Sequence, residues 1–114
     1  MQISVVIASI VGAPFLDACL ASLERQAKAL EAEVLVVSCG PKQRAEQTAK
    51  EFPWTRVIHV PTRETVPELR RRGVLESRGE IVFVIEEHTA ACPDWLEEAL
   101  RGHQRSMCRI FSIS

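Results

Sequence analysis

The sequence has almost no net charge, few aromatic side chains and no long apolar run. Its 14 lysines and arginines balance 15 aspartates and glutamates, so the net charge of −1 gives no broad attraction to nucleic acid or anionic membranes. The one basic run, Arg70, Arg71 and Arg72, has no aromatic platform beside it, so nucleic acid is not an expected partner. No apolar run approaches the ~20 residues that span a bilayer.

Closely spaced cysteines and the start of an export signal are also missing. The four cysteines, Cys19, Cys39, Cys92 and Cys108, form no CxxC or similar pair, which is typical of reduced thiols in the cytosol. Met1 leads almost directly into an apolar strand, without the basic segment that opens a signal peptide. We therefore expect a cytoplasmic protein. No GxSxG elbow or Ser-His-Asp arrangement indicates a hydrolase.

Apolar strand patterns alternate with helical patterns along a chain whose length suits one compact domain, residues 1–114. The sequence predicts strands over residues 3–9, 33–37, 56–60 and 80–85, and allows a fifth in the tail, 107–114. It predicts helices over residues 16–30, 42–52, 65–77 and 92–104, the last with Pro93 at its first helical position. This alternation predicts an α/β fold of three layers, with a mostly parallel sheet and helices on both faces.

The predicted helix 65–77 combines a start signal with an unusual basic run. Thr65 is placed to cap it, with Glu68 at the third helical position. The three arginines at 70–72 span most of a turn, so they cannot all face one ligand. Gly73 costs about 1 kcal/mol relative to alanine inside a helix, which indicates a close backbone approach to the sheet or to a ligand.

Polar residues follow three of the predicted strands. The strands end in Ala8-Ser9-Ile10, Ser38-Cys39-Gly40 and Glu86-Glu87-His88, and open α/β sheets bind ligands at this edge. In an extended segment Glu86 and His88 point to the same side, where they offer a carboxylate and an imidazole to a divalent ion or to a ligand's polar groups. Glu87 points the other way, which favours a solvated side chain. The alternative is a polar loop without a ligand.

Six segments together resemble the nucleotide-binding half of the family 2 glycosyltransferases, which have the GT-A fold. In chain order they are SVVIAS, CLASLERQ, EVLVVS, PELRRRG, SRGEIVFVIEEH and PDWLEEAL, and they cover residues 3–100. The resemblance implies binding of a nucleotide-diphospho-sugar. The end of the first strand, Ala8, Ser9 and Ile10, would then lie against the nucleobase and ribose.

The resemblance also assigns the other site residues. The family usually has an acidic residue facing the base after its second strand, and this chain has Ser38 and Cys39 there. The family's Arg-Asn-x-Gly corresponds to RRRG, which places Arg70 at the nucleotide and Gly73 in the same motif. Its Asp-x-Asp, which holds the diphosphate's metal and the ribose, corresponds to Glu86-Glu87-His88. Glu86 and His88 would then be the ligands of Mn²⁺ or Mg²⁺.

In this family an acceptor-binding half, with the catalytic base, follows the matched region. We expect that half to be missing here, the tail 105–114 to lie outside the resemblance, and no catalytic base to be identifiable. The predicted function is the donor-binding part of an enzyme that moves a sugar from a nucleotide-diphospho-sugar to an unknown acceptor. The alternative is a non-catalytic nucleotide-binding or interaction module, whose uncovered sheet edge favours self-association or a membrane-associated partner.

Overall fold

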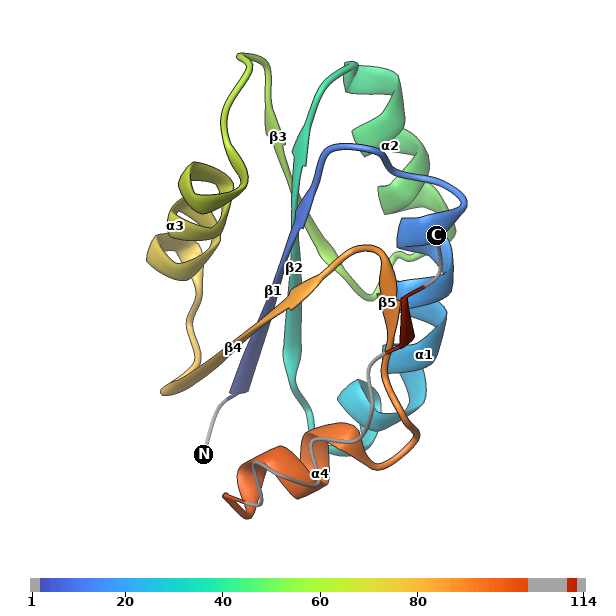
Figure 1. The fold of residues 1–114 in the computed structure, drawn as a ribbon, viewed down its shortest axis with the longest axis vertical. Coiled ribbons are helices and arrows are strands. Elements are labelled where there is room, and N and C mark those ends of the chain that lie inside the picture. The colour runs from blue at the N-terminus through green and yellow to red at the C-terminus, as the bar shows by residue number, and fades with distance from the viewer. Residues whose placement is uncertain (1–2, 103–110, 113–114) are drawn as a thin grey trace.

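Four parallel strands form the central sheet of the computed structural model, which describes residues 3–102 and the backbone of 111–112. The strand order is β3-β2-β1-β4 (Figure 1). The strands are β1 (Ile3–Ser9), β2 (Glu33–Cys39), β3 (Arg56–Val60) and β4 (Ile81–Glu86). β1 lies between β2 and β4 and is buried throughout, as its unbroken apolar pattern predicts.

Helices cover both faces of this sheet. The helices α1 (Phe15–Ala29), α2 (Lys42–Glu51) and α4 (Trp95–Leu100) lie on one side, and α3 (Val66–Glu76) lies alone on the other (Figure 1). The alternation of β1 side chains feeds two cores: Val5 and Ile7 pack with α1 and α4, whereas Val6 packs with Leu69 of α3. The predicted three-layer α/β fold is therefore confirmed.

Gly73 lets α3 approach the sheet closely. A Cβ atom at this position would lie 2.3 Å from Cγ1 of Val6 and 3.1 Å from Cγ2 of Val37. Contact with β1 and β2 thus accounts for a glycine inside a helix. At the start of α3 the expected capping box is present, because Thr65 and Glu68 each bond the other's backbone N–H.

The last part of the chain differs from the sequence prediction. The fourth helix begins at Trp95 with Asp94 as its N-cap, so Pro93 lies before the helix and not at its first position. The structure describes it as ending at Leu100; residues 103 and 104 of the predicted helix lie outside the described residues. Of the predicted tail strand, 107–114, the described part is β6 (Phe111–Ser112). It pairs antiparallel with β5 (Thr89–Ala90) in a separate small sheet.

The cysteines of the described residues have different states. Cys19 and Cys39 are buried free thiols, whereas Cys92 is disulfide-bonded. The prediction that all four cysteines are reduced is therefore wrong for Cys92. Burial and the charge of Glu87 raise the pKa of the Cys19 thiol to about 12, which makes this thiol unreactive at neutral pH. Within residues 3–102, no helix is long and apolar enough to cross a membrane.

Two carboxyl groups meet between α1 and α2. Burial, followed by the charge of Glu51 and a hydrogen bond with it, raises the pKa of Asp17 above its usual value. We expect Glu51→Gln to stabilise the fold at pH 7.5 by about 0.5 kcal/mol, because the like charges then no longer repel. An acid whose pKa is raised by folding weakens the fold as the pH rises from its ordinary pKa of 3.8 to the raised pKa, so no gain is expected at pH 3. Urea unfolding at both pH values is the measurement, and an equal gain at pH 3 would contradict this explanation.

Candidate functional site

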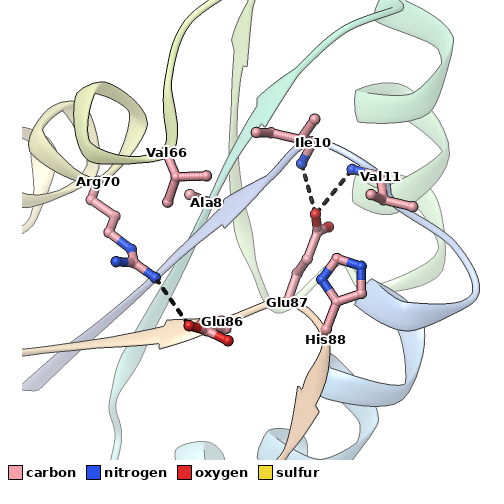
Figure 2. Close-up of a pocket in the computed structure, with 8 residues that line it drawn as sticks. All are labelled: Ala8, Ile10, Val11, Val66, Arg70, Glu86, Glu87 and His88. Atoms are coloured by element: carbon pink, nitrogen blue, oxygen red, sulfur yellow. Dashed lines mark hydrogen bonds and ion pairs between the residues drawn. The ribbon is translucent and has the colours of Figure 1, made fainter. Parts of the chain in front are cut away.

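The carboxyl ends of β1 and β4 and one turn of α3 enclose a pocket of about 260 Å³. We call it the β4 pocket, and Figure 2 shows its side chains. It is lined by Ala8, Ile10, Val11, Val66, Arg70, Glu86, Glu87 and His88. Five residues named from the sequence, Ala8, Ile10, Arg70, Glu86 and His88, thus share one cavity at the sheet edge where α/β proteins bind ligands.

Arg70 is the arginine of the basic run that faces this pocket. Its Nη2 lies 4.0 Å from Oε1 of Glu86, and its Nε is buried without a hydrogen-bond partner among the described residues (Figure 2). Arg71 is exposed, and Arg72 pairs with Glu64, whose pKa it lowers mainly through a hydrogen bond. The expectation that the three arginines do not share one ligand is confirmed, and a guanidinium with a free donor is left in the pocket.

Glu86 and His88 both line the β4 pocket, as their spacing predicted, although β4 ends at Glu86 and His88 lies in the following turn. The Glu86 side chain is 69% exposed, and the imidazole of His88 packs on Phe15 with ring centroids 4.7 Å apart. No group of three or more histidine, cysteine, aspartate or glutamate side chains that could hold a metal occurs within the described residues. An ion held by Glu86 and His88 would therefore need oxygen atoms of the ligand and water to complete its shell.

Glu87 is the clearest departure from the sequence prediction, because its carboxylate is buried and not solvated. It accepts a hydrogen bond from the Ser9 hydroxyl at 2.7 Å. It also accepts from the backbone N–H groups of Ile10, Val11 and Gly12 at 2.8, 2.9 and 3.1 Å. The loop after β1 therefore wraps around this one carboxylate, whose oxygens are occupied and are not available to a metal ion.

Arg44 of α2 holds the same loop from the other side. Its Nη1 donates to the backbone oxygens of Ile10 and Cys39, and so joins the loops that follow β1 and β2. Gly12 and Gly40 have φ values of +81° and +133°, and a Cβ atom at either would meet the Arg44 side chain at 2.6 or 3.2 Å. Both peptide groups of Ile10 are thus fixed, one by Glu87 and one by Arg44.

The remaining residues named from the sequence lie elsewhere. Ser9 is buried, and its hydroxyl donates a hydrogen bond to Glu87. Cys39 is buried and faces a second cavity, where its Sγ donates to the backbone oxygen of Thr62. Gly73 packs against the sheet and does not line the β4 pocket. The sequence alone does not mark Glu87 and Arg44 as residues that organise these loops, because their partners lie far away in the chain.

The chain is an α/β protein with a parallel sheet and a charged pocket at the carboxyl ends of its strands, which is the edge where such sheets commonly bind ligands. The sequence model of the family described as Glycosyl transferase family 2 matches residues 4–113, and the chain belongs to this family. The resemblance noted from the sequence is confirmed. None of the curated proteins matches the chain.

Solved structures share the fold at low sequence identity. Staphylococcus aureus TarS 1–349 has a TM-score of 0.78 and 19% identity, over 92% of this chain and 33% of that one. Mycobacterium tuberculosis glucosyl-3-phosphoglycerate synthase, in complex with Mn²⁺, UDP and phosphoglyceric acid, has a TM-score of 0.73 and 21% identity, over 90% and 38%. The Pyrobaculum calidifontis mannosyltransferase PcManGT, in complex with GDP-Man and Mn²⁺, has 0.74 and 18%, over 87% and 31%. The chain therefore has a GT-A-like fold and spans about a third of the length of each of these proteins.

Proposed function

We propose that this chain binds a nucleotide-diphospho-sugar in the β4 pocket, as the donor-binding part of a glycosyltransferase that passes the sugar to an acceptor. The observation that carries the proposal is the convergence of Arg70, Glu86 and His88 on one cavity of about 260 Å³. The structural neighbours support it, because their complexes contain UDP or GDP-Man with Mn²⁺.

The roles of the three side chains follow from their chemistry. Glu86 and His88 would hold a divalent ion, and a carboxylate with an imidazole suits Mn²⁺, with Mg²⁺ as the harder alternative. Bound to the diphosphate, that ion would neutralise charge that develops when the sugar leaves. Arg70 would donate its guanidinium N–H groups to a phosphate oxygen, and its exposed partner Glu86 lies 4.0 Å away, within reach of the same group.

The non-catalytic module stays as the second candidate, because the far edge of β4 is open within the described residues. Among the described residues β4 pairs with β1 on one side only, and Val84 within β4 is 42% exposed. An open edge of this kind can pair with another strand. Size-exclusion chromatography distinguishes a monomer from a self-associated module, and nucleotide binding without any sugar transfer would favour the second candidate.

Calorimetric titration with UDP, GDP and dTDP, with and without Mn²⁺, tests the proposal. We expect Mn²⁺-dependent binding by the unmodified chain, and loss of that dependence in Glu86→Ala/His88→Ala. Arg70→Ala should weaken binding about tenfold or more, because one charge-assisted hydrogen bond is lost. Arg71→Ala is the matched control, since this exposed neighbour on the same helix does not line the pocket. A folded chain that binds no nucleotide would overturn the proposal.

A further inference from the structure

One face of α1 contacts the segment that carries the candidate metal ligands Glu86 and His88. The residues of this face lie three or four positions apart, as neighbours on a helix surface do. They are Phe15, Cys19, Ser22 and Gln26, and each contacts a residue between 86 and 96. The helix α1 therefore supports the chain that follows β4.

Hydrogen bonds from this face fix the backbone after β5. The Ser22 hydroxyl accepts from the backbone N–H of Ala91 at 2.9 Å. The buried Gln26 amide donates to the backbone oxygen of Cys92 at 2.9 Å and accepts from the backbone N–H of Leu96 at 2.8 Å. Because Gln26 is shielded from water, these bonds hold the segment at one place on α1.

The imidazole of His88 is held differently, because no hydrogen bond to either ring nitrogen occurs within the described residues. A histidine that binds a metal ion normally donates its other ring N–H to an oxygen atom, which fixes the orientation of the ring. Phe15 supplies a contact of another kind: the two ring centroids lie 4.7 Å apart, and the ring planes are inclined by 39°. A change in the orientation of the imidazole would cost this contact.

Phe15 is itself fixed by the loop that wraps around Glu87. The helix α1 begins at Phe15, and the next residue, Leu16, is fully buried and donates its N–H to the backbone oxygen of Gly12 at 3.0 Å. The N–H of Gly12 in turn donates to Glu87, the neighbour of His88. Both rings thus extend from backbone segments that are joined to each other, so Phe15 offers the imidazole a fixed surface.

We propose that Phe15 is a positioning residue: it holds the imidazole of His88 in the β4 pocket beside Glu86 and thereby strengthens the binding of the divalent ion. Phe15 has no polar atom in its side chain and does not line the pocket, so it acts only through His88. Without Phe15 the imidazole would lose conformational freedom when the ion binds, and this entropy cost would weaken the binding. This inference rests on the proposed function, in which Glu86 and His88 hold the ion.

Nuclear magnetic resonance tests the contact in the protein without metal or nucleotide. The ring of Phe15 should displace the resonances of the carbon-bound ring protons of His88 from the values of an unstacked histidine. Phe15→Leu, which keeps an apolar side chain, should abolish the displacement, and Phe15→Tyr should keep it. The chain has three histidines, and His88→Gln identifies the resonances of this one.

Calorimetric titration with UDP and GDP over a range of Mn²⁺ concentrations tests the role. In Phe15→Leu the Mn²⁺ concentration that gives half-maximal nucleotide binding should rise about threefold to tenfold, the range expected for one lost aromatic contact. Phe15→Tyr should restore the original value. Phe52→Leu is the matched control, because Phe52 is also partly buried against another ring, that of Trp54, and does not line the β4 pocket. In a His88→Ala background, Phe15→Leu should cause no further change.

The outcomes separate this inference from the proposed function. An unchanged Mn²⁺ requirement in Phe15→Leu, or an equal rise in the His88→Ala background, would overturn the positioning role and leave the donor site standing. Resonances of His88 that do not respond to Phe15→Leu would do the same. Circular dichroism checks that each variant is folded, and Phe15→Met takes the place of Phe15→Leu if the latter does not fold. A folded, unmodified chain that binds neither nucleotide at any Mn²⁺ concentration would overturn the proposed function and this inference together.

Discussion

Replacing Glu87 with alanine is expected to lower the free energy of unfolding by about 3 kcal/mol. The carboxylate is 5% exposed and accepts four hydrogen bonds, three of them from consecutive backbone N–H groups. Without it these donors have no partner in the protein. Water replaces only part of the loss, because Ile10 and Val11 are about 40% exposed but Ser9 and Gly12 are buried. Urea unfolding followed by circular dichroism measures the effect.

The variant Glu87→Gln separates charge from volume at the same position. Its amide keeps the size of the side chain and one oxygen for the N–H groups of Ile10 and Val11. Its NH₂ group then faces the N–H of Gly12, so part of the loss should remain. Glu86→Gln is the matched control: this neighbour is 69% exposed, and its replacement should change stability by less than about 0.5 kcal/mol. Because the loop carries Ile10, a wall of the β4 pocket, nucleotide affinity should fall in folded Glu87→Gln. A stability equal to that of the unmodified chain would contradict the role of Glu87.

The prediction for Glu87 from sequence was wrong in environment. Alternation along the chain places its side chain on the other side of the strand from Glu86 and His88, whereas in the structure all three line the β4 pocket. What surrounds it is a loop 75 to 78 residues earlier in the chain, which local pattern cannot reveal. The capping box of Thr65 and Glu68 shows the opposite case, because both partners lie within one helical turn and the sequence alone predicts their bonds.

The same distinction applies to the rest of the chain. The ends of strands with continuous apolar runs, such as β1, were predicted to within two residues. A run of apolar residues is itself the local signal of a buried strand. β5 and β6 are two residues each and depend on pairing between distant segments, and the disulfide of Cys92 likewise depends on the fold. Arg44 was missed for a related reason: its guanidinium bonds the backbone oxygens of Ile10 and Cys39 on two separate loops, where glycines leave room for the side chain.

Replacing Trp95 with alanine is expected to cost about 3–5 kcal/mol of stability, which is typical of a fully buried tryptophan. The side chain is 1% exposed and lies in the core between α1 and the sheet, with its ring 5.6 Å from that of Phe83 in an edge-to-face arrangement. Trp95 does not line the β4 pocket. It therefore acts as a core residue, as the sequence predicted, and not as a platform for a sugar ring.

Trp95→Phe gives the comparison that tests this assignment. The Nε1 atom of Trp95 is buried without a hydrogen-bond partner among the described residues, so phenylalanine removes an unsatisfied donor as well as some volume. We expect its cost to stay below about 1.5 kcal/mol, because the edge-to-face contact with Phe83 can be kept. Thermal and urea unfolding measure both variants, and calorimetry measures nucleotide-sugar affinity in Trp95→Phe. Weaker binding of the nucleotide-sugar by a fully folded Trp95→Phe, with unchanged affinity for the corresponding nucleoside diphosphate, would show that the indole contacts the sugar after all.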